Sequence, residues 1–366
     1  MQLTRREFGQ MAVAAIPATH LLAQPNSTFG GVRIGIITYS FRGLPSSAEE
    51  VLRYCVECGI DGIELMSNVA ESYAGAPAQA GRGPMSGGGT GPAGAGAPGQ
   101  GRASGAPPAA AGGPPAAAGA PGQGMPPGGG RPAPTPEQQE AMRKRAEEMR
   151  NWRLSVPMSK YKAFRTMYED AGVKIYAFKL EPTLAMSDAE YDYIWNVGET
   201  LGADHITMEL PTSDELLQRV AEYAAKRRLR IAFHTHGQGG SSGFDKVLGA
   251  SKYTALNFDV GHYYGVNGQS PAPLVEKYHD RIASLHLKDR KGPAGAAGEG
   301  RAAMGGGGAN MPWGQGETPL KEILQLMKRN KYRFPASIEY EYRTPEGSDV
   351  LTEIKKCVQY CKDALA

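Results

Sequence analysis

Apolar and polar positions follow two periods along this chain, and together they predict a repeated succession of strands and helices. Strand-like apolar runs lie at 32–39, 62–66, 173–178, 205–209, 230–236, 256–259, 282–286 and 336–341. Helix-like segments lie at 46–58, 157–171, 187–201, 213–227, 320–330 and 350–364, and another helix starts at Pro136. Strands that alternate with helices favour parallel crossovers, and therefore a closed barrel or an open doubly wound sheet.

The number of strand–helix units decides between these two folds. Eight units favour a (β/α)8 TIM barrel, and no GxGxxG motif follows the first strand to support a dinucleotide-binding sheet. The segments 32–73, 136–290 and 311–364 together come close to the roughly 250 residues typical of one barrel. One TIM barrel domain is therefore predicted over residues 32–364.

Two low-complexity blocks interrupt this domain. The chain contains 49 Gly and 27 Pro, many of them in the blocks at about 74–134 and 291–310. Neither block has an apolar period, so both are predicted to be disordered. Each follows a predicted strand directly, which makes both of them insertions in βα loops, on the rim where barrel active sites lie. They either screen the entrance or are neutral expansions of surface loops.

The N-terminus predicts a secretion signal. A twin-arginine pair, Arg5-Arg6, precedes a short apolar stretch at 11–23, which is typical of a twin-arginine (Tat) export signal over residues 1–23. The alternative is an accidental Arg-Arg before an Ala-rich start. The stretch is too short to span a bilayer stably. We expect a periplasmic protein without stable membrane insertion after cleavage, or a tethered one if the signal is retained.

Charge and cysteines narrow the class further. The net charge of +3 and the lack of a basic stripe argue against a nucleic-acid partner. Cys55 and Cys58 share one predicted helix face, and Cys357 and Cys361 share another, each beside core-type residues. Buried unpaired thiols are the simplest interpretation. An inter-helix disulfide and a four-cysteine zinc site are alternatives, although the helical spacing is poor for zinc.

Four consecutive strands end in residues that bind metals. They supply His234, Asp259, His286 and Glu339. The carboxyl ends of parallel barrel strands meet at one rim, so these side chains are expected to converge. Burying such groups without partners costs several kcal/mol each, a cost that a cation removes. Two His, one Asp and one Glu favour Mn²⁺, Co²⁺ or Zn²⁺ over Mg²⁺.

Several motifs on these strands resemble a known family. Asp259-Val-Gly-His262, His286-Leu-Lys288-Asp289, the Gly-x-Gly loop after Trp313 and the terminal Glu339 are similar to motifs of the xylose isomerase-like TIM barrels. The resemblance covers nearly all of 32–364 outside the two blocks. It implies that Asp259, His286 and Glu339 are metal ligands. The strand-five ligand of the family is usually Glu, and His234 occupies that position here.

This resemblance implies an enzyme of sugar chemistry. The expected activity is that of a divalent-metal-dependent isomerase or epimerase, which abstracts a proton next to the carbonyl of a small carbohydrate and forms an enediolate. Epimerase members pair a strand-five with a strand-eight carboxylate, and His234 breaks that pair. A lyase or hydratase acting on a keto-sugar or 3-keto-glycoside is therefore the alternative. A phosphodiester-cleaving endonuclease and a non-catalytic sugar-binding barrel are further classes.

Other polar residues near the strand ends receive candidate roles. Catalysis is assigned to Glu339, Glu209 and His262, and substrate binding to His236, Lys288, Lys179 and Trp313. The competing roles are a surface acid for Glu209, a further ligand for His236 and a structural aromatic for Trp313. Glu64 is expected to contact substrate or a neighbouring Arg.

Overall fold

The computed structural model describes residues 24–77, 135–237, 241–293 and 308–366. The predicted signal at 1–23 and most of both low-complexity blocks lie outside the described residues. The chain divides into two compact units, 1–85 with 147–366 and 86–146. Among the described helices, none is both long enough and apolar enough to cross a membrane.

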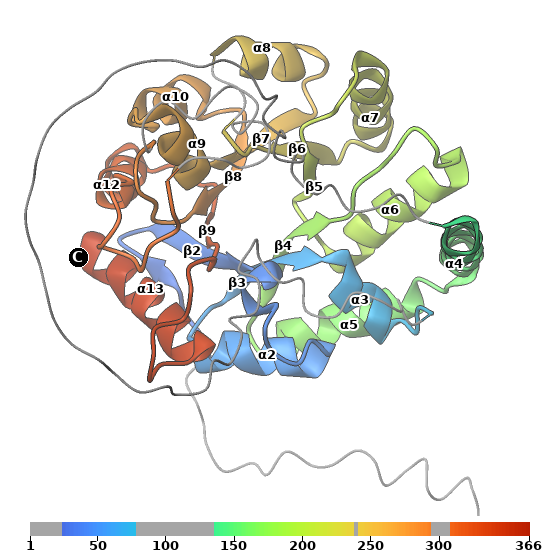
Figure 1. Ribbon diagram of the computed structural model, residues 1–366, viewed down its shortest axis with the longest axis horizontal. Coiled ribbons are helices and arrows are strands. Elements are labelled where there is room, and N and C mark those ends of the chain that lie inside the picture. The colour runs from blue at the N-terminus through green and yellow to red at the C-terminus, as the bar shows by residue number, and fades with distance from the viewer. Residues whose placement is uncertain (1–23, 78–134, 238–240, 294–307) are drawn as a thin grey trace, which may run out of the picture. The chain divides into compact units, whose positions relative to one another are not determined.

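Eight parallel strands form a closed barrel, as the sequence predicts (Figure 1). They are β2 (Val32–Ile37), β3 (Gly62–Met66), β4 (Lys174–Lys179), β5 (His205–Glu209), β6 (Arg230–His234), β7 (Thr254–Asp259), β8 (Ile282–Leu287) and β9 (Ala336–Ile338). The barrel closes where β9 pairs in parallel with β2, with Ile34 beside Ala336 and Ile36 beside Ile338. A short strand, β1 (Thr28–Phe29), pairs antiparallel with β2.

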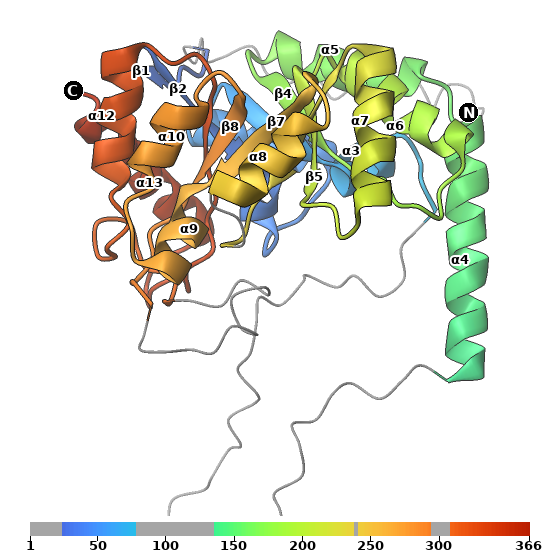
Figure 2. The ribbon, with the colours of Figure 1, turned by 90° about the horizontal axis from the view of Figure 1, so that it is seen from above.

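Helices cover the outside of the barrel, and Figure 2 shows several of them lying along the strands. They are α2 (Ala48–Glu57), α3 (Ser67–Tyr73), α5 (Ser159–Asp170), α6 (Asp188–Leu201), α7 (Asp214–Arg227), α8 (Ser241–Gly249), α9 (Val260–Asn267), α10 (Ala272–Tyr278), α12 (Leu320–Asn330) and α13 (Val350–Ala364), with a 3-10 turn, η1 (Thr38–Phe41). A further helix, α4 (Pro136–Ser155), buries none of its residues. The predicted capping box of Ser187 and Glu190 starts α6. The helix α3 separates the first low-complexity block from β3, so this block does not follow its strand directly.

The four cysteines are buried and unpaired, in agreement with the simplest interpretation of their spacing. Cys55 lies on α2 and Cys58 at its end, whereas Cys357 and Cys361 lie on α13. Burial raises the pKa of Cys58 and of Cys357 to about 12, so these thiols stay protonated at neutral pH. No cysteine belongs to a possible metal group within the described residues, so the zinc interpretation finds no support there.

Neutral polar side chains fill the barrel interior nearer the amino ends of the strands. The Tyr176 hydroxyl lies 2.5 Å from the hydroxyl of Ser337, and a His205 ring nitrogen lies 3.1 Å from that of Ser284. The Tyr176 ring occupies the space beside Gly35, where a Cβ atom would lie 2.5 Å from its oxygen. These side chains fill interior space below the charged groups, which lie nearer the carboxyl-terminal rim.

Candidate metal centre and substrate pocket

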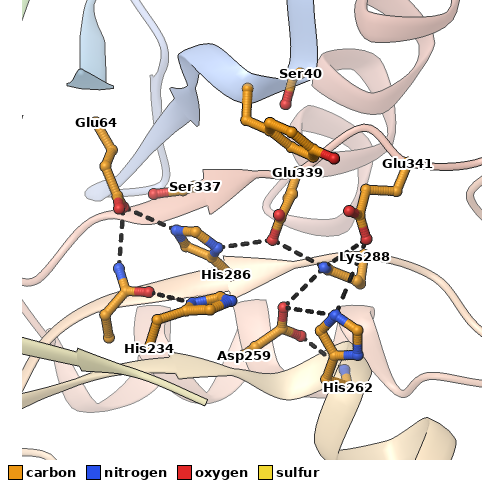
Figure 3. Close-up of polar contacts among 12 residues, drawn as sticks. Ser40, Glu64, His234, Asp259, His262, His286, Lys288, Ser337, Glu339 and Glu341 are labelled. Atoms are coloured by element: carbon orange, nitrogen blue, oxygen red, sulfur yellow. Dashed lines mark hydrogen bonds and ion pairs between the residues drawn. The ribbon is translucent and has the colours of Figure 1, made fainter. Parts of the chain in front are cut away.

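The four predicted metal ligands come together at the carboxyl ends of adjacent strands (Figure 3). His234 ends β6, Asp259 ends β7, His286 lies in β8 and Glu339 follows β9 by one residue. One ligand atom of each lies within 4.8 Å of the others, and all four residues are buried. The strand predicted over 336–341 is shorter, but the Glu339 amide still bonds the carbonyl of Leu287 at 3.0 Å and stays alongside β8.

His286 is held between two carboxylates. Its Nδ1 lies 2.7 Å from Glu339 Oε2, and its Nε2 lies 2.8 Å from Glu64 Oε2. Burial opposes a charge here, but the two carboxylates outweigh it and raise the pKa of His286 to about 10. A metal ion replaces the ring proton when it binds such a histidine. The bond to Glu64 would then orient the ring.

Glu64 is the buried hub of this network. Its carboxylate accepts hydrogen bonds from Thr207 at 2.7 Å and Asn257 at 2.9 Å as well as from His286. Burial raises its pKa, but the His286 charge and these bonds outweigh that effect and lower it to about 2. The sequence predicts a contact of Glu64 with substrate or Arg, but the structure buries it beneath the ligands.

Asn257 transmits the effect of Glu64 to the other histidine. A carboxylate only accepts hydrogen bonds, so Glu64 fixes the amide nitrogen of Asn257 on its own side. The amide oxygen of Asn257 therefore faces His234 Nδ1 at 2.7 Å, and this nitrogen carries the proton. Burial and the charges of Lys179 and His286 lower the pKa of His234 to about 3. His234 is thus neutral, with an Nε2 lone pair available to a cation.

Lys288 supplies positive charge to the same cluster. Its ammonium lies 3.0 Å from Asp259, 2.9 Å from Glu339 and 2.7 Å from Glu341. These carboxylates overcome the opposing effect of burial and raise its pKa. The predicted substrate contact of Lys288 stays a prediction, because in this structure the ammonium faces protein carboxylates.

The donor set of the cluster fits a divalent metal ion. It offers two carboxylates and two imidazoles, each with a ligand atom within reach of a common point. The Glu64 network supports both imidazoles from behind, as is usual for ligating histidines. His234, Asp259, His286 and Glu339 are therefore the residues that would hold the ion.

A second polar group stands beside the cluster. Glu209 ends β5 in register with His234 on β6. Its carboxylate lies 2.8 Å from His236 Nε2 and 2.7 Å from Lys179 Nζ. Burial raises the pKa of Glu209, but the bond to His236 and the charge of Lys179 lower it overall. Burial lowers the pKa of His236, but the same bond to Glu209 raises it overall and so favours the protonated ring.

His262 approaches the cluster from α9. Its Nε2 lies 4.0 Å from Asp259 Oδ2 and from Glu341 Oε2, and Arg290 contacts its Nδ1. Burial, with the charges of Lys288 and Arg290, holds its pKa well below the usual range. The Asp-x-x-His motif has a local cause, because Asp259 Oδ1 caps α9 by accepting the His262 amide at 2.7 Å.

A cavity of about 510 Å³ opens beside these groups. Its lining includes the predicted residues Lys179, Glu209, His234, His236 and Glu339. Asp259, His262, His286, Lys288 and Trp313 are not part of this lining. The cavity also reaches Asn68, Glu71 and Arg153, which carried no predicted role.

The loop after Trp313 is explained by Asp289 rather than by substrate. The Asp289 carboxylate accepts hydrogen bonds from the amides of Gly314 at 2.8 Å and Gly316 at 2.9 Å. A Cβ atom at Gly316 would come within 2.0 Å of Asp289 Oδ1, so this position needs glycine. Trp313 packs edge-on against Tyr360, with ring centroids 5.7 Å apart. Its proposed contact with a sugar stays a prediction.

Taken together, the closed barrel and the cluster at its carboxyl rim define a (β/α)8 protein with a candidate metal centre. The family model described as "Xylose isomerase-like TIM barrel" matches residues 146–360, and the chain belongs to this family. The resemblance drawn from the motifs is confirmed.

Known relatives carry names from sugar-related chemistry. An inosose dehydratase of Clostridium botulinum (strain Eklund 17B / Type B) is 28% identical over 156 residues, which are 40% of this chain and 52% of that protein. The chain thus spans about half the length of the curated relatives it matches. These relatives' names favour the prediction of an enzyme in the isomerase, epimerase or lyase classes, which stays a prediction for this chain.

Solved structures show the same fold at low sequence identity. A probable 3-DHS dehydratase of Bacillus anthracis superposes with a TM-score of 0.53 at 13% identity, over 90% of this chain and 99% of that one. A sugar phosphate isomerase/epimerase of Parabacteroides distasonis superposes with a TM-score of 0.51 at 15% identity, over 94% and 97% of the two chains.

Proposed function

We propose that this protein is a divalent-metal-dependent sugar isomerase or epimerase that abstracts a proton next to a substrate carbonyl. One observation carries the proposal. Glu209 lies in register beside His234, so the carboxylate that is missing at the end of β6 is supplied by the neighbouring strand. Acidic groups therefore line the cavity from two directions, Glu209 on β5 and Glu339 after β9.

The roles of the residues follow from their contacts. A bound divalent ion would act as a Lewis acid on the carbonyl and a neighbouring hydroxyl of the sugar. Glu339, exposed to the cavity, accepts the proton from the adjacent carbon. His236, whose Nε2–H is held by Glu209, returns a proton to the enediolate from the other side. Lys288 balances the carboxylate charge of Glu339 and Glu341.

A dehydratase is the second candidate, because it shares the enolisation step. The matching curated relatives are named inosose dehydratases, and a structural neighbour is named a probable 3-DHS dehydratase. In this reaction the His236 proton would go to a leaving hydroxyl and release water. Mass spectrometry separates the two candidates, since isomerisation conserves the mass of the sugar and dehydration removes one water.

Proton exchange tests the proposal directly. In D₂O with Mn²⁺, the wild-type protein should catalyse the incorporation of deuterium into a ketose at the carbon next to its carbonyl. NMR of the ketose detects this exchange. Glu339→Gln should abolish the exchange while part of the metal stays bound. Glu341→Gln is the matched control, because Glu341 lies two residues further along and pairs with Lys288. Near-wild-type exchange in Glu339→Gln would remove Glu339 from the mechanism.

We also propose export through the twin-arginine motif at Arg5-Arg6. We propose that the substrate is a small carbohydrate and that the protein binds no nucleic acid. Once residues 1–23 are cleaved, the protein does not insert stably into a membrane. Cell fractionation of the full chain against an Arg5→Lys/Arg6→Lys variant tests this proposal. Accumulation of both proteins in the same compartment would contradict it.

A further inference from the structure

Part of the cavity wall is formed by an ion pair that the proposed chemistry does not use. Arg153, near the end of α4, donates through Nε at 2.7 Å and through one terminal nitrogen at 3.2 Å to the two carboxylate oxygens of Glu71 on α3. Glu71 is only 1% exposed and also accepts a hydrogen bond from Tyr193 at 3.0 Å. This double contact fixes the plane of the guanidinium group.

Arg153 keeps donor capacity for a ligand. Its NH1 nitrogen makes no hydrogen bond within the described residues, although the side chain lines the cavity. The side-chain amide of Asn68, one turn before Glu71 on α3, also lines the cavity and likewise has no partner in the described part of the chain. Two polar groups with unused hydrogen-bonding capacity thus lie in the same cavity as the metal ligands His234 and Glu339.

The size of the cavity exceeds the need of one sugar ring. A hexose has about twelve non-hydrogen atoms, and about twelve waters at roughly 30 Å³ each would fill about 360 Å³. Bonded atoms pack more closely than waters, so a hexose fills less than this volume. The cavity of about 510 Å³ therefore leaves room for a further group beside one sugar ring.

The charges around Arg153 favour an uncharged group as its ligand. The described lining residues include one lysine, Lys179, and one arginine, Arg153. Each of these two cations is paired with a carboxylate. A phosphate next to Arg153 would also lie next to Glu71, whose charge repels it. Hydroxyl groups, in contrast, accept from the guanidinium and bond to the Asn68 amide without a net charge.

We propose that the substrate has two parts, a keto-sugar ring at the metal ligands and a second, uncharged hydroxyl-bearing ring at Arg153 and Asn68, as in a glycoside. This inference rests on the proposed function, because it takes the metal ligands as the reacting end. Arg153 is then a specificity-determining residue. Its loss should raise KM for two-ring substrates more than it lowers kcat.

The test compares three probes in the deuterium-exchange assay with wild-type holoenzyme. They are a 3-keto-monosaccharide, the same keto-sugar bearing a second glucose ring, and its phosphate ester. We expect kcat/KM to be at least about tenfold higher for the two-ring probe than for either other probe. Arg153→Met should lower this preference about tenfold, mainly through KM.

Loss of Arg153 leaves the buried Glu71 carboxylate without its ion-pair partner, which could destabilise the fold. Two further variants keep the test valid in that case. Asn68→Ala, on an exposed position, should also reduce the two-ring preference, by severalfold. Arg150→Met is the matched control, because Arg150 lies on the same helix, pairs with Glu190 and is not in the cavity lining. It should keep the wild-type preference.

The possible failures are distinguishable. Equal exchange of the one-ring and two-ring probes by the wild type, or a faster phosphate ester, overturns the two-part substrate and leaves the proposed function standing. An unchanged preference in both Arg153→Met and Asn68→Ala removes these residues from the subsite. Exchange on none of the probes contradicts the proposed function itself, and the subsite falls with it.

Discussion

Two histidines of the same barrel interior have opposite electrostatic environments. His205, at the start of β5, meets a serine hydroxyl, and burial lowers its pKa to about 4. His286, in β8, meets two carboxylates, and its pKa rises to about 10 in spite of the same burial. Burial alone therefore makes a neutral packing histidine. Carboxylates on both ring nitrogens make a charged one, and such a site accepts a metal ion in place of a proton.

The same substitution at both histidines gives the largest expected contrast. His286→Gln should lower metal affinity and turnover by more than about 100-fold, since residues that merely support a ligand already account for 10–100-fold. His205→Gln should keep metal and turnover and lose only about 1–3 kcal/mol of stability, the cost of disturbing one buried hydrogen bond. Titration calorimetry with Mn²⁺ and thermal unfolding measure both effects. Equal losses of metal affinity would refute the distinction.

Glu64 should show an intermediate effect. Glu64→Gln keeps the size of the side chain but replaces a carboxylate, which only accepts hydrogen bonds, with an amide that also donates them. The side chains of Asn257 and His286 then lose their fixed orientation. We expect metal affinity to fall about 10–100-fold. Glu71→Gln is a matched control, because Glu71 is another buried glutamate but contacts Arg153 and Tyr193 instead of the ligands. Wild-type metal affinity in Glu64→Gln would show that the hub does not support the site.

The smallest expected effect is the pH dependence of His205. Its folded pKa of about 4 lies below the usual histidine value of 6.5. The unfolded chain therefore binds more protons between these values, and stability present above pH 6.5 is lost as the pH falls towards 4. His205→Gln should flatten this part of the stability curve, measured by urea unfolding at pH 7 and pH 4.5. An identical pH dependence of stability in the wild type and the variant would contradict a folded His205 pKa of about 4.

The ligand cluster could be predicted from sequence because a parallel barrel brings strand ends together. His234, Asp259, His286 and Glu339 each close an apolar run, and the run length alone locates them on one rim. The eight strands and the main helices followed from the same periodicity. The signals for α3, α9 and α10 were weak, because these helices span seven or eight residues each and lie in segments without long apolar patterns.

The supporting contacts could not be predicted, because they depend on pairings across the barrel. Glu64 lies 222 positions from His286 in the chain, and Arg153 lies 82 positions from Glu71. A strand pattern assigns Glu64 to a face but does not say which of the other strands it meets. Arg153 gave no signal either, because it lies in a mixed-charge helix that resembles an ordinary solvated surface.

The central claim is that the four-ligand cluster binds a divalent ion, and the metal content of the purified protein tests it most directly. Mass spectrometry of the wild-type chain, dialysed after saturation with Mn²⁺, Co²⁺ or Zn²⁺, should find about one ion per chain, which disappears in His286→Gln and remains in His205→Gln. A wild-type chain that retains no ion under these conditions, or an unchanged ion content in His286→Gln, would contradict the account.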